Sequence, residues 1–243
     1  MMNQLASYQK TYTITTNYLD RFDDLSLTGM LDLFQDIAGR HAYLLKAGFL
    51  DMKKQDLIWV IARNHVKVIK EIPFGEDLIV KTWPLVPTRF YFDRIYQLLD
   101  QNGELLASAR SRWLLVDSKT RKMAPSSRYN YPLTSFANSN PFKEDFPSIL
   151  AIDENIAPIF EHRVLASEID HNEHFNNTRY AELVYNSIRP KRKNSIEEFM
   201  LYYHSEVKLN ETISVRKLVE DNVITITGTS NNTLAFSARV VMR

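Results

Sequence analysis

One short polar segment, IDHNEHFNNTRY at residues 169–180, combines residue types that hydrolysis uses. Side chains alternate along an extended chain, so Asp170, Asn172 and His174 are expected to project from one face. The segment runs into a helix predicted over 177–188, whose N-terminus carries unpaired N–H groups and a partial positive charge. A carboxylate, an amide and an imidazole beside such donors suit hydrolysis, with the helix end holding a developing oxyanion.

The alternative interpretation of this segment is a polar loop that only caps the helix through one of the residues Asn176–Thr178. The repeat described below favours a site, because the first half has Asp20, Phe22 and Asp24 at the matching places. Because the amide and the imidazole occur in only one of the two copies, they indicate a function that this copy has retained.

Other catalytic signatures are missing from the sequence. No Gly-x-Ser-x-Gly and no glycine-rich phosphate loop occur among the six glycines, and cysteine is absent. Thiolate nucleophiles, disulfides and cysteine metal sites are therefore excluded. His171 and His174 alone are weak evidence for a metal, so we expect neither a metal nor a cofactor.

Composition indicates an ordinary globular protein, with 44% hydrophobic and 24% charged residues among 243. A net charge of +1 gives no reason to expect a nucleic-acid partner. No segment approaches the roughly 20 apolar residues of a membrane helix, and the first residues show no signal or transit pattern. We therefore expect a cytoplasmic protein that binds neither nucleic acid nor membrane.

The predicted elements follow one order twice. Each half has a strand, a helix and then four strands, an α+β arrangement in which an antiparallel sheet wraps around the helix. In the first half, Ser26 or Thr28 is expected to cap the helix and Gly48 to end it. The expected strands are 8–16, 57–70, 77–84, 89–99 and 104–117, then 160–168, 198–208, 211–220, 222–229 and 233–242.

An ungapped comparison supports this repeat. Asp20 falls on Asp170 at an offset of 150 residues, and Glu71 falls on Glu206 at an offset of 135. The smaller second offset means that the second half has the shorter helix region. The predicted domains are residues 1–135 and 159–243, joined by a linker at 136–158.

Several further runs are specific when taken together. They are YLDRFDDLSLTGMLDLFQDIAGRHA, LIWVIARNHVKVIKEIPFGEDLIVKTWP, Arg94, Ser111–Asp117 and Thr120–Lys122, followed by Asp170, Asn172, His174 and Asn177 as Asp-x-Asn-x-His-x-x-Asn. In these runs, and over nearly its full length, the chain resembles the acyl-[acyl carrier protein] (acyl-ACP) thioesterases of bacteria and plant plastids.

The resemblance implies two tandem hotdog domains, with the active residues in the second. It also implies a catalytic Glu on a strand after the helix, which the run LYYHSEV places at Glu206. His204 and Val207 stand where the family has Arg and Cys, so a Cys-His-Asn mechanism cannot operate. The implied reaction is hydrolysis of the acyl-ACP thioester, in which a buried Glu206 activates a water or attacks directly.

The remaining roles are implied by the same resemblance. His174 is expected to hydrogen-bond the catalytic carboxylate or the reacting centre, Asn172 to position water or the thioester oxygen, and Asp170 to orient its neighbours. The backbone N–H groups of Asn177 and Thr178 are expected to stabilise the oxyanion.

Two more sets of residues have candidate roles. An acyl chain needs an apolar cavity, and the candidates for its wall are Trp59, Trp83, Phe90 and Phe92, each of which an ordinary core would explain equally well. An acidic carrier protein needs a basic surface, and the candidates are Arg189, Lys191, Arg192 and Lys193, which would otherwise be a solvated helix end.

Two other functions stay open at this point. One is a hotdog thioesterase that acts on acyl-CoA, and the other is a non-catalytic protein that binds acyl thioesters. A hotdog dehydratase fits the polar residues less well. The fused halves would supply the paired hotdog that single-domain relatives form by dimerising, so a monomer or a homodimer is expected.

Overall fold

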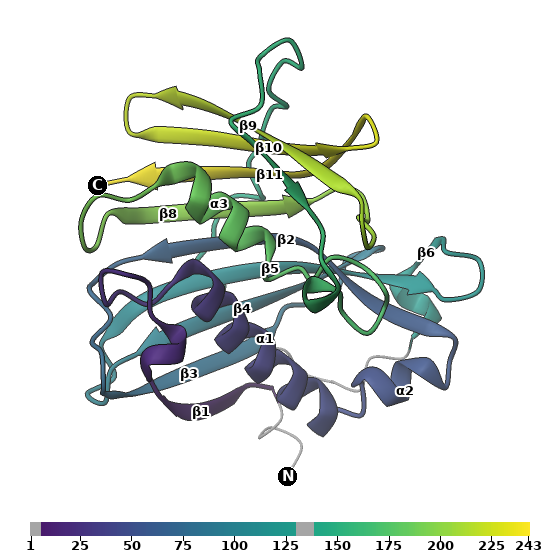
Figure 1. The fold of residues 1–243 in the computed structure, drawn as a ribbon. Coiled ribbons are helices and arrows are strands. Elements are labelled where there is room, and N and C mark those ends of the chain that lie inside the picture. Colours follow the sequence, from purple (N-terminus) through teal and green to yellow (C-terminus); the bar gives the residue numbers. More distant parts are fainter. Residues whose placement is uncertain (1–5, 130–138) are drawn as a thin grey trace.

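The computed structural model describes residues 6–129 and 139–243, which form one antiparallel sheet with α1 and α3 on one side (Figure 1). In this part of the chain the strand order is β1-β3-β4-β5-β2-β8-β11-β10-β9-β7, with β6 paired to β5. Read inward from either edge, each half places its strands in the same order. The inner strands β2 and β8 pair antiparallel and join the halves.

The strands agree closely with the predicted ranges. Those of the first half are β1 (Tyr8–Thr13), β2 (Leu57–Val68), β3 (Asp77–Pro84), β4 (Tyr91–Leu99), β5 (Leu105–Asp117) and β6 (Met123–Ala124). Those of the second half are β7 (Phe160–Arg163), β8 (Ile196–Tyr203), β9 (Thr212–Glu220), β10 (Val223–Ser230) and β11 (Thr233–Met242). β7 and β8 end about five residues earlier than expected, which matters for the site below.

Helix α1 (Leu27–Leu44) crosses the first half of the sheet. Ser26 caps it, as predicted, because its hydroxyl accepts the N–H of Gly29 at 2.9 Å. The apolar residues that the helical spacing picked out face the sheet and are buried, among them Met30, Leu33, Phe34 and Ile37. The predicted helix end is wrong: α1 stops at Leu44, and Gly48 instead begins the short helix α2 (Phe49–Lys53).

Helix α3 (Tyr180–Ile188) has 9 residues, against 18 in α1, so the shorter helix region expected in the second half is confirmed. Residues 177–179 form a turn before the helix rather than its first turn. The ring of Tyr180 packs edge-on against Phe175 and Phe236, at centroid distances of 4.6 and 5.3 Å. This aromatic cluster fixes the start of α3 next to the polar segment.

The described part of the predicted linker, residues 139–158, lies on the side of the sheet opposite to the helices. Tyr96 of β4 packs against Phe34 of α1, and its neighbour Ile95 points the other way and clusters with Phe142. The predicted boundary between residues 135 and 136 lies outside the described residues. Within the described ranges, no helix combines the length and the apolar character that crossing a membrane requires.

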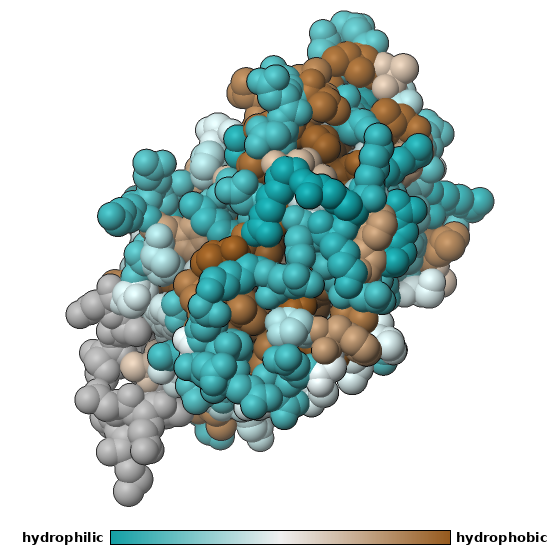
Figure 2. All heavy atoms as spheres, turned by 90° about the vertical axis from the view of Figure 1, so that its left-hand side faces the viewer, coloured by the Kyte–Doolittle hydropathy of each residue, from teal (hydrophilic) through white to brown (hydrophobic). Residues whose placement is uncertain are grey.

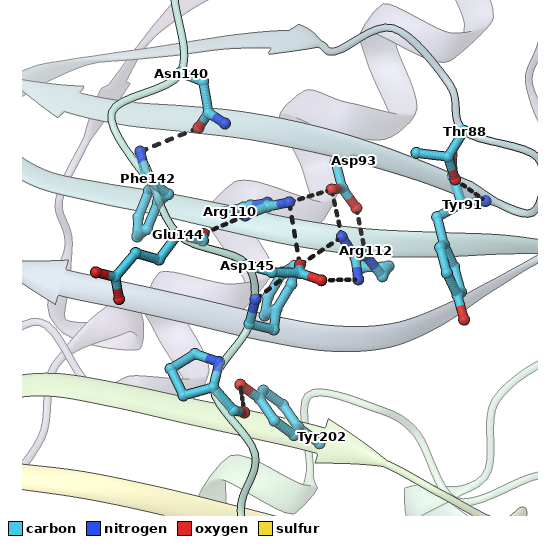
Figure 3. A network of polar contacts seen from close by, with 12 residues as sticks. Thr88, Tyr91, Asp93, Arg110, Arg112, Asn140, Phe142, Glu144, Asp145 and Tyr202 are labelled. Carbon is cyan, nitrogen blue, oxygen red and sulfur yellow. Dashed lines mark hydrogen bonds and ion pairs between the residues drawn. The ribbon is translucent and has the colours of Figure 1, made fainter.

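An ionic network connects the linker to the sheet, with its strand residues buried and its linker carboxylate exposed (Figure 3). Asp93 of β4 accepts hydrogen bonds from Arg110 and Arg112 of β5, and Asp145 of the linker accepts from Arg112 at 2.9 Å. Burial alone would lower the pKa of Arg112, but the hydrogen bonds to Asp93 and Asp145 outweigh it and raise the pKa. The guanidinium therefore stays charged, and its pairing holds the linker in place.

Candidate active site

Asp170 shapes the polar loop that precedes α3. Its Oδ1 accepts the N–H groups of Asn172 and His174 at 2.8 and 3.2 Å, and its own N–H donates to the carbonyl oxygen of His174 at 2.8 Å. Glu173 has a positive φ of 65° within this loop. The expected extended chain is therefore wrong, because the Asp170 carboxylate closes the backbone into a tight turn.

The turn nevertheless presents the predicted set of side chains. Asp170, Asn172 and His174 are half-buried, whereas His171 and Glu173 are exposed. The burial of these side chains alternates as the prediction would have it, although the backbone is a turn and not an extended chain.

Glu206 meets His174 from a loop that follows β8, not from a strand as expected. Its Oε2 lies 3.0 Å from Nε2 of His174. The backbone fixes this approach, because the N–H of Phe175 donates to the carbonyl oxygen of Val207 at 2.8 Å. The side chain of Glu206 is 48% exposed and that of His174 is 18% exposed, so the expected burial of Glu206 is not found.

Arg121 has no predicted role, yet its guanidinium donates to the second carboxylate oxygen, Oε1, of Glu206. It follows β5 in the first half of the chain, 85 positions before Glu206. The one signal in the sequence that marks it is the Thr120–Lys122 run among the residues of the resemblance. The site therefore contains residues from both halves.

The two N–H groups expected to act as oxyanion donors lie in the turn before α3 and differ in their hydrogen bonding. Oδ1 of Asn176 accepts both the N–H and the hydroxyl of Thr178, at 3.0 and 3.2 Å, so this N–H is already occupied. The carbonyl oxygen of Asn177 accepts the hydroxyl of Tyr203 at 2.9 Å. The N–H of Asn177 makes no hydrogen bond to any described residue, and it remains the available donor.

Trp59 and Phe92 belong to an apolar cluster beneath α2. Their rings meet edge to face at 4.9 Å, and the indole N–H of Trp59 donates to the carbonyl oxygen of Ala47 at 2.9 Å. The cluster also contains Leu45, Met52, Leu57, Leu115, Ala124 and Tyr129. It lies next to the polar loop, because the ring of Phe49 on α2 meets the ring of His171 edge-on at 4.9 Å.

The other two wall candidates lie apart from this cluster. Trp83 packs with Ile95 and Phe142 on the linker side of the sheet, and its indole N–H donates to the carbonyl oxygen of Ser139 at 2.7 Å. Phe90 lies half-buried in a bend before β4. Trp59 and Phe92 are thus the two candidates that the structure brings near the loop.

The predicted basic run follows the C-terminal end of α3, while the polar loop precedes the other end. Lys193 lies 4.0 Å from Asp23, and Arg192 donates to the carbonyl oxygen of Arg243. Figure 2 views the molecule from the side where Figure 1 marks the C-terminus, and hydrophilic residues cover most of that face. The structure therefore does not bring this run to His174.

Two family models match the chain: "Acyl-ACP thioesterase N-terminal domain" over residues 6–127 and "Acyl-ACP thioesterase C-terminal domain" over residues 153–238. The chain belongs to the acyl-ACP thioesterase family. This confirms the resemblance seen in the sequence, and the two matches fall on the two halves of the sheet.

Curated acyl-ACP thioesterases are similar to this chain. The palmitoyl-acyl carrier protein thioesterase of Cuphea hookeriana, named as chloroplastic, is 28% identical over 196 residues, which is 76% of this chain and 47% of that protein. The dodecanoyl-[acyl-carrier-protein] hydrolase of Umbellularia californica is 23% identical over 213 residues, 82% of this chain and 56% of that protein. The chain spans about half the length of these curated relatives.

Solved acyl-ACP thioesterase structures share the fold. That of the Bacteroides thetaiotaomicron acyl-ACP thioesterase gives a TM-score of 0.87 at 22% identity and covers 100% of both chains. That of the Umbellularia californica 12:0-ACP thioesterase gives 0.84 at 18% identity and covers 98% of this chain and 97% of that one. The tandem hotdog architecture is thereby confirmed.

Proposed function

We propose that the protein hydrolyses the thioester of acyl-ACP, releasing a free fatty acid and ending chain elongation. The observation that carries this proposal is the contact of 3.0 Å between His174 and Glu206, in the loop that also holds Asn172 and leads into α3. A carboxylate and an imidazole meet there, with an amide two residues before the imidazole, in a chain without cysteine. This set can direct water onto a thioester carbonyl.

In the proposed mechanism Glu206 is the general base. Its carboxylate takes a proton from a water that Asn172 helps to position, while the water oxygen bonds to the thioester carbonyl carbon. The N–H of Asn177 and the positive end of α3 stabilise the charge that develops on the carbonyl oxygen. The C–S bond then breaks, and the proton passes with the help of His174 to the departing thiolate.

Direct attack by Glu206 is the second route for the same site. The carboxylate would form an anhydride with the acyl group as the C–S bond breaks and the thiolate leaves, and water would then open the anhydride. Mass spectrometry after a single turnover in ¹⁸O-water detects this route when water opens the anhydride at the Glu206 carbonyl. The base route places ¹⁸O in the fatty acid, whereas attack by Glu206 with hydrolysis at the Glu206 carbonyl leaves the label in the protein.

We place the acyl chain against the cluster that contains Trp59 and Phe92. Their rings pack directly on each other, so a chain that enters must displace side chains beneath α2. The position of this cluster beside His171, through Phe49, supports the proposal.

We propose an acyl carrier protein as the partner and α2 as its first contact. Phe49 and Leu50 are 50% and 65% exposed, and the Lys53 ammonium lies 5.9 Å from the centre of the Phe49 ring. Among the described residues, no ion pair involves Lys53 or Lys54. An acidic carrier on this surface would lie next to His171, and the run Arg189–Lys193 would be a second, more distant contact.

The proposed function requires neither a second subunit nor a metal or cofactor. β2 and β8 already pair two hotdogs within one chain, so a monomer is complete and a homodimer is compatible with it. The reaction as written uses no metal and no cofactor. The cytoplasmic location stays a prediction.

The decisive experiment offers the purified protein a mixed acyl-ACP pool and, in parallel, acyl-CoA of the same chains. Fatty acid release from acyl-ACP is expected, and Glu206→Ala and His174→Ala should abolish it without changing the circular dichroism spectrum. Glu173→Gln, in the same loop but exposed, is the matched control. Near-normal turnover in either Ala variant contradicts the assignment, preference for acyl-CoA favours the rival enzyme, and binding without turnover favours a binding protein.

A further inference from the structure

The Glu206 carboxylate is held from both halves of the protein. His174 of the second half contacts Oε2, and Arg121 of the first half donates to Oε1. Building on the function proposed above, we propose that Arg121 is a positioning residue, which orients the Glu206 carboxylate for the reaction.

The turn that carries Arg121 is built independently of Glu206. Oδ1 of Asp117 accepts the N–H groups of Lys119 and Thr120, at 3.1 and 2.8 Å, and the hydroxyl of Thr120 at 3.1 Å. The N–H of Arg121 donates to the carbonyl oxygen of Asp117 at 2.9 Å. The guanidinium is thus presented by a turn that is already fixed.

The backbone at Arg121 lies in the left-handed region, with a φ of +57°. Other residues such as Lys46, Glu173 and Arg189 share this conformation, so the role of Arg121 rests on its contact with Glu206.

The ion pair itself contributes little to folding. The side chains of Arg121 and Glu206 are 44% and 48% exposed, and water screens pairs of this kind. Its effect is therefore expected on the reaction. With one oxygen held by each half, the carboxylate is kept in a single orientation.

The test compares Arg121→Gln and Arg121→Lys with the control Lys119→Gln. Lys119 lies in the same turn, but its ammonium pairs with Asp56 and not with Glu206. Both carrier-bound substrate and a small soluble thioester are used. For Arg121→Gln we expect kcat to fall at least tenfold on both substrates and KM to change less than twofold, because the carboxylate loses its orientation and not the substrate its binding site. Arg121→Lys should recover part of kcat, and Lys119→Gln should behave as wild type.

Two outcomes overturn the proposal: an unchanged kcat in folded Arg121→Gln, or a loss confined to the carrier-bound substrate. A readout without turnover separates this idea from the proposed function. Crystal structures of the wild type and of Arg121→Gln show the orientation of the Glu206 carboxylate directly. The carboxylate should leave its wild-type orientation in Arg121→Gln whether or not the protein is a thioesterase, and an unchanged orientation again rejects the role of Arg121.

Discussion

Asp20 and Asp170 make the same pair of hydrogen bonds in equivalent turns of the two halves. In each turn Oδ1 accepts the backbone N–H groups two and four residues later, at 2.8 and 3.2 Å. The shared residue therefore builds the turn, and the residues that differ between the copies determine what the turn can do. Asn172 and His174, which are present only in the second half, make its turn a candidate site.

Asp170→Ala and Asp20→Ala are predicted to separate folding from activity. Each loses two hydrogen bonds, which should lower the free energy of unfolding by about 1–3 kcal/mol. Asp20 also accepts the hydroxyl of Tyr185 on α3 at 2.9 Å, so its variant should be the less stable one. Only Asp170→Ala should lose hydrolysis, by roughly 100-fold, because it releases His174 from its position.

Urea denaturation and kcat/KM on acyl-ACP measure the two effects. Equal activities in the two variants would show that the Asp170 turn does not position the chemistry.

Local pattern was sufficient to predict the succession of helices and strands along the chain, the Ser26 cap, and the distinction of Asp170, Asn172 and His174 from their exposed neighbours. The extended backbone was wrong because a short polar side chain can bond the neighbouring N–H groups and replace strand geometry with a turn. The matching Asp20 is a signal in the sequence for this turn, since a residue kept in both copies points to a shared structural task.

The contacts between the two halves could not be predicted from the sequence. β8 ends early because the N–H groups of His204 and Ser205 both donate to the carbonyl oxygen of Ala235, at 2.9 and 3.3 Å, which breaks the ladder. Glu206 therefore reaches the site from a loop. Its contact with Arg121 depends on how β2 and β8 pair, and no local periodicity reports that pairing.

Phe92→Leu is predicted to change which acyl chains are released. The variant opens space in the cluster with Trp59, so the products of a mixed acyl-ACP pool should shift toward longer chains. Trp83→Leu is the matched control, because Trp83 packs on the linker side of the sheet. Leu is used because truncation to Ala typically costs about 3–5 kcal/mol.

Gas chromatography of the released acids gives the profile, with melting curves to confirm that both variants fold. The placement of the acyl chain would be wrong if Trp83→Leu altered the profile and Phe92→Leu did not.

Charge reversal at α2 is predicted to weaken the use of the carrier. Lys53→Glu with Lys54→Glu should reduce kcat/KM on acyl-ACP by roughly tenfold at low salt, because the positive charge that attracts the acidic carrier is lost. The reduction should be smaller at high salt, which screens this attraction. Reversal of Lys191, Arg192 and Lys193 should have a smaller effect, since α3 separates that run from His174. A small soluble thioester should react normally with both variants, and equal losses on both substrates would argue against docking at either surface.

His204 is predicted to make stability depend on pH below neutrality. Burial of part of its ring, and the nearby charge of Arg63, lower the pKa of His204 from the ordinary 6.5, while the ring hydrogen-bonds the hydroxyl of Ser237 at 2.9 Å. The unfolded chain therefore binds this proton more readily than the folded one does. The stability contribution is complete above about pH 6.5 and declines as the pH falls from there toward the folded pKa.

His204→Gln keeps a polar partner for Ser237 but cannot titrate, so it should lose less stability than the wild type between pH 7 and lower pH. Urea denaturation of both proteins at several pH values measures the difference. Parallel losses in the two proteins would show that His204 does not set this dependence. A smaller loss in the variant would establish that this residue, at the position where the family has Arg, makes the end of β8 sensitive to acid.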